Sequence, residues 1–381
     1  MDTAGRQVVR PTTVDYVCLQ PMRQGQASYA HAGNIIAGLR QRGWRVRLIR
    51  PPLPHPGALD GLRRAVNVLL VQARYWARIG FRPADVVYIR THFAALPTAL
   101  LARARHALVV QELNGPVDDA FDAWPALRRI PGLITWLVRT QLRAADAIVV
   151  VTPGLATYAT ELTGKTTRCY VVGNGADTNL FQPVHDVQTS PGNPYAVFVG
   201  ALASWQGVNV ILDAAASGAW PSGVDLVIAG DGREGGRVSS AVAACPRIRW
   251  LGTIPYRQSA DLVAGSIAAL VPKLDSSASR FGLSPLKLFE AMASGVPVVV
   301  SDLPGLRDVV QAHDCGLIVQ PGDAEALASA VRQMAGDRAR ACAMGQNGRR
   351  AALAEYSWSS RAGQTEKVFL ELAERKRSRL R

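Results

Sequence analysis

Lys287 and Glu290 stand three residues apart in a segment that predicts a short helix between a glycine-bearing loop and a buried strand. Ser284 is a suitable N-cap, Pro285 fits the first helical position, and Gly295 ends the helix. A lysine in the first turn opposes the helix dipole, whereas a helix start attracts phosphate, so a bound phosphate would explain it. A carboxylate one turn further on could accept hydrogen bonds from a ribose diol. The alternative is an i,i+3 ion pair on the surface.

The run Ser-Pro-Leu-Lys-Leu-Phe-Glu at 284–290 resembles the signature of family-4 retaining glycosyltransferases, which have the GT-B fold. The usual signature is a pair of glutamates separated by seven residues, and the second, which binds the nucleotide ribose, matches Glu290. The first glutamate falls on Gly282, so the chain looks like a subgroup of that family. The resemblance implies that the donor diphosphate lies at the helix start, beside Gly282, Leu283, Ser284 and Leu286.

The loop from Val199 to Val208 departs from the family pattern. Family members often carry an arginine and a lysine there that hold the diphosphate, but the matching residues are Ala201 and Gln206. Diphosphate still requires compensating charge. We expect it from the nearest cations of this half, which are Lys273, Arg280 and Lys287. The same loop would contact the donor through Gly200, Trp205 and Gln206. The alternatives are solvated loop charges and, for Trp205, packing in the core.

The N-terminal half offers residues for the other substrate. Gly25 and Gln26 lie in the position of the family's glycine-containing donor loop, where a glycine lets the backbone approach a diphosphate. Polar residues follow two further strands, and such strand ends face the crevice of an open α/β sheet. We expect these residues, Arg90, His92, Glu112 and Asn114, on the acceptor or sugar side. For His92 a hydrogen-bonded structural role is an equal alternative.

The segment Gly230-Asp-Gly-Arg-Glu-Gly235 matches the dinucleotide fingerprint GxGxxG. That fingerprint also wants a carboxylate at the end of the next strand, which here ends Arg249-Trp-Leu251. A nicotinamide or flavin is therefore not expected. No nucleophile elbow, zinc helix, phosphate loop or convincing metal pair occurs either. The prediction is an enzyme without cofactor or metal, which stabilises a leaving nucleotide diphosphate electrostatically.

The length of 381 residues and the hydrophobic content of 48% fit two packed α/β domains. Apolar runs predict six strands between residues 14 and 172 and six more between 196 and 319, alternating with helices such as 122–143. The segment 182–194 reads as a linker. The expected fold is GT-B: two Rossmann-like doubly wound domains facing a central cleft. Residues 1–185 are predicted to form the acceptor-binding, membrane-facing domain and residues 193–355 the donor-binding domain. Residues 356–381 are predicted to form a helix that crosses back to the N-terminal domain.

The net charge of +14 is unevenly distributed. Residues 1–190 contain 22 Lys and Arg against 12 Asp and Glu, whereas residues 191–356 contain 14 of each. Two N-terminal stretches, 62–82 and 124–143, combine arginines with aromatic residues and suit an anionic membrane interface. Core-packing helices with a solvated basic face are the alternative.

The five cysteines are odd in number and lack CxxC spacing, so neither zinc nor a disulfide framework is indicated, and a reducing cytoplasm is expected. No secretory signal or spanning segment is evident. We expect a cytoplasmic enzyme at the inner face of the cell membrane. It would move a hexose, with retention, from a nucleotide-diphosphate sugar to a lipid-linked or glycan acceptor in bacterial polysaccharide or glycolipid synthesis.

Three rival functions remain open at this point. A GT-B sugar-nucleotide epimerase would need an acid–base set that the sequence does not show. A basic nucleic-acid-binding protein would explain the charge, but no recognised motif supports it, so no nucleic acid partner is expected. An inactive, acceptor-binding relative is the third, because two of the family's usual cations are missing. The donor base, the sugar and the acceptor are not predicted.

Overall fold

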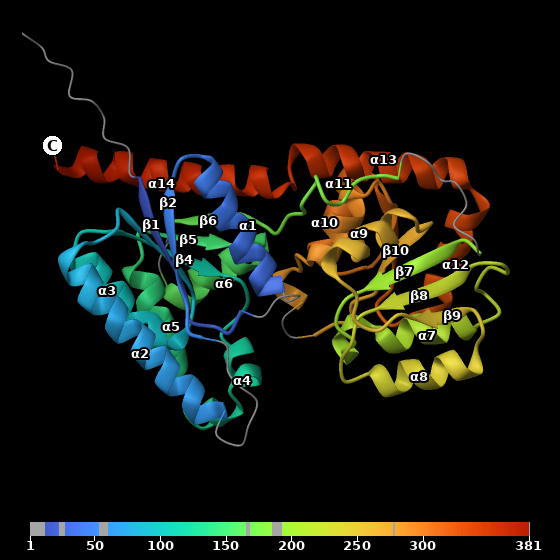
Figure 1. Cartoon of the computed structure of the whole chain (residues 1–381), viewed down its shortest axis with the longest axis horizontal. Helices are drawn as coiled ribbons and strands as arrows, with labels where there is room; N and C mark the ends of the chain where they lie inside the picture. The colour runs from blue at the N-terminus through green and yellow to red at the C-terminus, as the bar shows by residue number, and fades with distance from the viewer. Residues whose placement is uncertain are drawn as a thin grey trace, which may run out of the picture. The chain divides into compact units, whose positions relative to one another are not determined.

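The computed structural model describes residues 12–22, 27–52, 60–164, 168–184, 193–276 and 279–380. The chain forms two compact units, the first made of residues 1–172 and 361–381 and the second of residues 173–360. Each unit contains one six-stranded sheet with flanking helices (Figure 1). All twelve predicted strands are present, and the paired strands run parallel, as buried apolar runs separated by helices require.

The first sheet has the order β2-β1-β3-β4-β5-β6. Its strands are β1 (Thr13–Cys18), β2 (Arg45–Ile49), β3 (Val86–Arg90), β4 (Leu108–Leu113), β5 (Ala147–Val150) and β6 (Cys169–Val171). The accompanying helices are α1 (Ala27–Gln41), α2 (Asp60–Phe81), α3 (Leu96–Ala104), α4 (Asp119–Ala123), α5 (Pro131–Ala144), α6 (Pro153–Thr163) and most of α14 (Trp358–Leu380).

The two faces of the first sheet pack against different helices because side chains alternate along each strand. Val17 and Val87 join a core that also contains residues of α2 and α3. Tyr16 and Tyr88 point to the opposite face, where their rings lie 5.1 Å apart. Phe369 of α14 contacts Tyr88 there, with ring centroids 5.4 Å apart. The last helix of the chain therefore completes the core of the first unit.

The helix predicted over 122–143 is wrong, because three shorter elements occupy this region. They are the end of α4, a 3₁₀ helix at Pro125–Arg129 and α5. Pro125 and Pro131 each begin a new element. Proline lacks the N–H that would continue a preceding helix, so both residues are start signals here.

The second sheet has the order β12-β11-β10-β7-β8-β9. Its strands are β7 (Tyr195–Val199), β8 (Asp225–Ala229), β9 (Ile248–Trp250), β10 (Ala268–Val271), β11 (Val298–Ser301) and β12 (Gly316–Val319). Its helices are α7 (Val208–Ala216), α8 (Gly235–Ala244), α9 (Tyr256–Ala264), α10 (Leu286–Ala293), α11 (Leu306–His313), α12 (Ala324–Gly336) and α13 (Arg338–Ala354). The strand order reverses between β7 and β10, and ligands of open α/β sheets bind at the carboxyl ends of the strands at such a point.

The boundary between the units lies at Gly173, upstream of the predicted linker. The segment after it is held by the second unit. The backbone N–H of Ala176 donates to the carbonyl of Tyr356 over 2.8 Å, and Phe181 is fully buried in that unit's core. At the other end the first unit resumes at Arg361, five residues later than the predicted start of the crossing helix at 356.

Candidate functional site

Helix α10 begins one residue later than the sequence predicts. Pro285 is its N-cap residue and Leu286 its first helical residue, so Ser284 does not cap the helix. The hydroxyl of Ser284 instead accepts a hydrogen bond of 3.1 Å from the backbone N–H of Asn174. Within the described residues, no acceptor takes the backbone N–H of Ser284 or of Leu286. These N–H groups lie at the positive end of the helix dipole, which favours an anion.

Lys287 extends from the first turn of α10 toward the loop that follows β7. Its Nζ donates to Oε1 of Gln206 over 3.2 Å. The same Nζ lies 3.7 Å from the centroid of the Phe198 ring, close enough for a cation–π contact. A methyl group on Gly200 would come within 2.9 Å of it, so the glycine leaves room for the ammonium group. The structure therefore brings Lys287 of α10 next to Gln206 and Gly200, three residues that the sequence predicts at the donor.

The pKa values of Lys287 and of Lys273, which follows β10, are both lowered. Burial, followed by the nearby charge of Lys273, holds the pKa of Lys287 well below its usual range. Burial alone lowers the pKa of Lys273 to about 8. Among the described residues, no carboxylate lies within 4.0 Å of either lysine. An anion that enters here would raise both pKa values, because an opposite charge stabilises the protonated form.

Glu290 is buried, with 9% of its surface exposed. The hydroxyl of Tyr256, the first residue of α9, donates to its Oε1 over 2.8 Å. Burial raises the pKa of Glu290 to about 7, although the Tyr256 hydrogen bond and the charge of Lys287 both act to lower it. The carboxyl group is therefore held in a fixed orientation and changes its charge near neutral pH.

The surface ion pair between Lys287 and Glu290, the alternative that the spacing allows, is wrong. Their charged atoms are not within 4.0 Å of each other, and each side chain contacts a different partner. Both line a small, partly open cavity of about 10 Å³ against β7 and β10. A space of this size holds one water molecule at most, so a larger ligand would bind outside it.

The glycines of the 230–235 segment serve loop packing. A Cβ on Gly230 would lie 1.8 Å from the carbonyl oxygen of Gly200, and one on Gly232 would lie 2.3 Å from that of Leu202. Glycine is therefore required by the close approach of two backbones. This contact supports the loop that carries Gln206 and accounts for the first two glycines of the GxGxxG pattern.

The remaining residues predicted in the second unit differ in exposure. Trp205 is 55% exposed, so it does not pack in the core. Arg280 is exposed, and its guanidinium lies 4.6 Å from the centroid of the Phe281 ring. Gly282 has a φ of +86°, and the N–H of Leu283 is taken by the carbonyl of Pro304. Leu283 therefore cannot offer its N–H to a phosphate.

A second cluster of polar side chains surrounds Glu112 in the first unit. The buried carboxylate accepts hydrogen bonds from Tyr16 at 2.8 Å, from Arg90 at 2.7 Å and from Asn114 at 2.6 Å. His31 of α1 approaches it to 3.3 Å. Burial opposes ionisation, but His31, Arg90 and Asn114 together hold the pKa of Glu112 far below its usual range. Three of the four residues predicted on the acceptor side thus form one network.

His92 lies apart from that network in its bonding. Its Nδ1 accepts the backbone N–H of Ala94 over 3.2 Å and caps a 3₁₀ helix at Phe93–Ala95. The imidazole also stacks on Phe93, and burial lowers its pKa to about 4. These contacts favour the alternative reading of His92 as a hydrogen-bonded structural residue. Gly25 and Gln26 lie outside the described residues.

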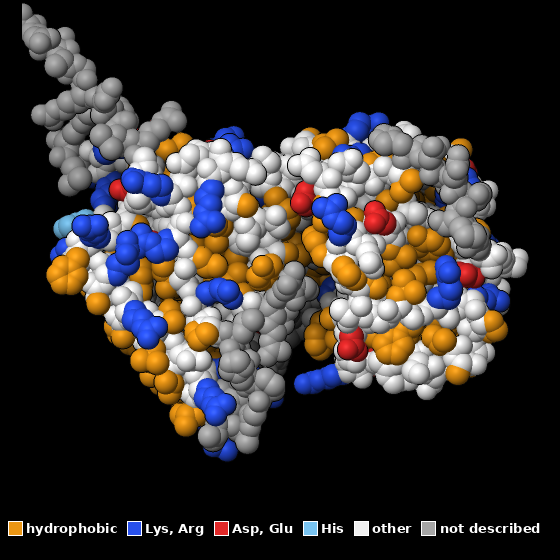
Figure 2. All heavy atoms as spheres, in the orientation of Figure 1, with side chains coloured by type: hydrophobic (Ala, Val, Ile, Leu, Met, Phe, Trp, Pro, Cys, Tyr) orange, Lys and Arg blue, Asp and Glu red, His pale blue; other side chains and the backbone are white. Residues whose placement is uncertain are grey.

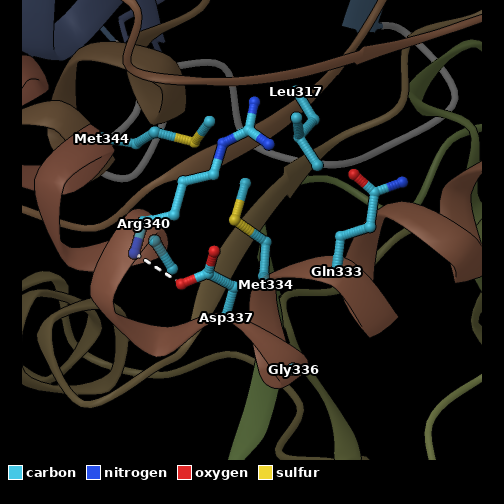
Figure 3. A pocket seen from close by; sticks show the side chains of 8 residues that line it. Leu317, Gln333, Met334, Gly336, Asp337, Arg340 and Met344 are labelled. Carbon is cyan, nitrogen blue, oxygen red and sulfur yellow. Dashed lines mark hydrogen bonds between the residues drawn. The ribbon is translucent and has the colours of Figure 1, made fainter.

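A separate pocket of about 260 Å³ lies between β12, α12 and α13. Figure 3 shows Leu317, Met334 and Met344 around it. Its one carboxylate, Asp337, accepts the backbone N–H of Arg340 as a helix cap. No predicted site residue reaches this pocket, which is mainly apolar. Within the described part of the chain, no three His, Cys, Asp or Glu side chains gather as metal ligands.

Two family models match the chain. Residues 30–180 match Glycosyltransferase Family 4, and residues 193–337 match Glycosyl transferases group 1. The chain is 27% identical over 324 residues to alpha-maltose-1-phosphate synthase of Mycolicibacterium smegmatis, covering 76% of this chain and 80% of that one. It is 34% identical over 153 residues to a phosphatidyl-myo-inositol mannosyltransferase of Mycobacterium leprae, covering 39% and 38%.

Solved structures give the same result for the fold. Sucrose-phosphate synthase from Thermosynechococcus elongatus superposes with a TM-score of 0.76 at 18% identity, covering 95% of this chain and 99% of that one. The HepE protein of Anabaena in complex with UDP superposes with a TM-score of 0.69 at 17% identity, covering 94% and 99%. The chain belongs to the family-4, group 1 glycosyltransferases and has the GT-B fold. Its activity is therefore glycosyl transfer.

Proposed function

We propose that the chain transfers a hexose, with retention of anomeric configuration, from a nucleotide-diphosphate sugar to a lipid-linked or glycan acceptor in bacterial polysaccharide or glycolipid synthesis. One observation carries the donor part of this proposal. Lys287 is a largely buried cation at the start of α10, beside the carboxyl ends of β7 and β10, and no carboxylate of the described residues pairs with it. A cation desolvated in this way costs free energy unless an anion binds to it.

The donor diphosphate would bind Lys287, Lys273 and the N–H groups of Ser284 and Leu286. The two lysines compensate for the missing family cations at Ala201 and Gln206, and Gln206 positions Lys287 instead of binding phosphate itself. The exposed Arg280 would reach the diphosphate only from the surface of the unit. These groups stabilise charge on the departing diphosphate, which is electrostatic catalysis.

Glu290 would bind the ribose. With Oε1 held by Tyr256, the carboxylate presents its other oxygen to the diol, in hydrogen bonds that strengthen when the group is ionised. The exposed face of Trp205 offers a stacking surface for the base or the sugar. In the first unit, the network around Glu112 would orient Arg90 and Asn114 toward the acceptor. The complex of the structural neighbour HepE with UDP supports a nucleotide donor.

A thermal-shift screen against UDP, GDP, ADP and their sugars tests the donor proposal. A ligand at 100 times its Kd should stabilise the chain by about 2.7 kcal/mol, and the same base should stabilise as nucleotide and as nucleotide sugar. NMR of the product formed with the stabilising sugar then reports the anomeric configuration. An inverted product would contradict retention, and an epimerised nucleotide sugar would indicate the epimerase instead.

The first unit would also bind an anionic membrane surface at the inner face of the cytoplasmic membrane. On α2, Tyr75 is buried and Trp76 donates to Thr98, so neither ring is an interface anchor. The exposed large apolar residues there are Leu62, Val66, Leu69, Leu70 and Phe81, and Ile130, Leu133 and Trp136 are exposed around α5. Hydrophobic and basic side chains lie side by side over α2 (Figure 2). No helix in the described part of the chain is long and apolar enough to cross a bilayer.

Neutralising basic residues near α5 should weaken binding to anionic vesicles. We expect Arg→Gln changes at four exposed positions, Arg128, Arg129, Arg139 and Arg143, to reduce binding roughly 100-fold or more, since each basic residue at the interface contributes about 1 kcal/mol. Flotation with anionic and with neutral vesicles measures it. The matched control carries Arg→Gln at four exposed arginines of the second unit, Arg237, Arg332, Arg338 and Arg350. Equal binding of both variants, or binding without preference for anionic vesicles, would refute the membrane surface.

A further inference from the structure

A concave, strongly basic surface lies at the amino-terminal edge of the first sheet, the opposite edge from the Glu112 network. It encloses about 260 Å³. Leu108 starts β4 there, Asp146 directly precedes β5 and Arg168 directly precedes β6, while the last turns of α14 form the other wall. We call this concavity the basic pocket. Its cationic side chains are Arg103, Arg168, Arg375, Lys376 and Arg379.

The positive charge of the basic pocket is not balanced by its own residues. Asp146 is its one carboxylate, and its Oδ2 accepts the backbone N–H of Val109 over 2.8 Å. Arg375 pairs with Glu371 at 2.6 Å. Arg168 and Arg379 have no ion-pair partner within the described residues. Several cations that converge on one hollow repel one another unless an anion lies between them.

The backbone at the rim is held in an unusual conformation. His106 has a φ of +61°, a region in which a residue with a Cβ is strained. Its N–H donates to the carbonyl of Arg103, and its own carbonyl accepts the ammonium group of Lys376. This turn therefore ties α14 to the end of α3. The conformation also ends α3, because the N–H of the next residue, Ala107, donates to the carbonyl of Ala102 over 3.0 Å.

The helix dipole explains only part of this cluster. Basic residues in the last turn of a helix stabilise it, and this accounts for Arg379 at the end of α14. It also accounts for Arg103, in the last turn of α3. It does not account for Arg168, which comes from the loop before β6. Three separate segments thus contribute cations to one hollow.

We propose that the basic pocket binds a phosphate-bearing anion with two or more negative charges. Arginine guanidinium groups bind phosphate oxygens in pairs, and several of them around one hollow match a multiply charged phosphate better than a carboxylate. The anion would join α14 to the sheet edge, so its binding stabilises the first unit. The phosphate belongs either to a soluble molecule or to a lipid headgroup. This site is independent of the donor site of the second unit.

The test follows thermal unfolding of the full chain with inorganic pyrophosphate, in a Lys273→Met/Lys287→Met background that removes the proposed donor phosphate site. Pyrophosphate should raise the Tm of this protein. Adding Arg168→Gln and Arg379→Gln should increase the concentration needed for the same shift by about tenfold or more. The matched control adds Arg338→Gln and Arg350→Gln, exposed arginines of the second unit, and should leave the response unchanged. If the double change prevents folding, Arg379→Gln alone is measured.

A second arm distinguishes the two sources of phosphate. The same variants are floated with phosphatidylcholine vesicles that contain phosphatidic acid. Dependence on Arg168 and Arg379 with pyrophosphate supports a soluble anion, and dependence only with the vesicles supports a headgroup. No dependence with either probe overturns the proposal. Loss of DNA retention in the double variant, without a response to pyrophosphate or vesicles, overturns it in favour of nucleic acid.

Discussion

Replacing Lys287 with Met is expected to lower kcat/KM for glycosyl transfer by about 100- to 1000-fold, the scale seen when one preorganised charge-stabilising group is removed. Met has a similar length, and its sulfur can occupy the space over the Phe198 ring where Nζ now lies. The fold should survive, and the Tm should stay the same or rise. The reason is that the lowered pKa of Lys287 marks a cation that the folded state disfavours.

Two measurements on the wild type and the variant check this: initial rates at varied donor concentration, and binding of the bare nucleoside by calorimetry. Binding of the bare nucleoside should change little, because the lysine acts on phosphate. Lys367→Met, at an exposed lysine of α14, is the control and should retain full activity. Wild-type turnover in a Lys273/Arg280/Lys287 triple Met variant would show that the diphosphate is held by other groups.

Glu290→Ala should weaken donor binding by roughly 1.5–3 kcal/mol, the range for a hydrogen bond to a charged group. The variant would lose the hydrogen bonds to the ribose diol and would leave the Tyr256 hydroxyl without the carboxylate to which it donates. Tyr256→Phe, which keeps the ring and removes only the hydroxyl, should have a smaller effect on the same affinity. A folded Glu290→Ala variant with unchanged donor affinity would exclude Glu290 from the ribose site.

The same residue should set the acid side of the pH profile. Glu290 has a pKa of about 7, so kcat/KM should rise with pH through that value as the carboxylate forms. Lys273 has a pKa of about 8 and the pKa of Lys287 is also well below its usual range, so kcat/KM should fall on the alkaline side as these cations are lost. Glu290→Gln should remove the acid limb and Lys273→Met should shift or remove the alkaline limb.

The free energy of unfolding should change with pH in the direction opposite to kcat/KM: it should fall as Glu290 ionises. The folded pKa of Glu290 is raised from its ordinary 4.5, so the folded state binds this proton more tightly. Its contribution is complete below about pH 4.5 and is lost as pH rises to about 7. Glu290→Gln should flatten the unfolding free energy over that window. An unchanged pH dependence in both kcat/KM and stability would show that the carboxyl group does not titrate there.

The strands were the part of the fold that the sequence predicted most fully. Parallel strands buried on both faces leave continuous apolar runs, as at Val298–Ser301. The helix over 122–143 was misjudged because its arginines and aromatics fit a helical period that two prolines interrupt. The unit boundary was misplaced because a polar linker is visible in a sequence, whereas a buried Phe181 in the preceding loop is not.

The candidate site was predictable only where partners are close in sequence. Lys287 and Glu290 stood out because they share one helix, but their actual partners, Gln206 and Tyr256, lie far from them along the chain. Nothing around Tyr256 marks it as the donor to a carboxylate. Arg90, Glu112 and Asn114 of the second cluster were predicted, but their contacts with Tyr16 and His31 were not, since those two side chains meet the carboxylate only once β1, β4 and α1 are in place.

The position of α14 has a consequence for the order in which the chain can fold during synthesis. Residues 173–360 are contiguous, so the second unit can close its core as soon as they have left the ribosome. The first unit is synthesised earlier, but Tyr88 and Trp44 lack their contacts with the Phe369 ring until α14 has been made. The N-terminal half is therefore completed last, and a nascent or truncated chain that stops before 361 exposes an aromatic face that chaperones would have to cover.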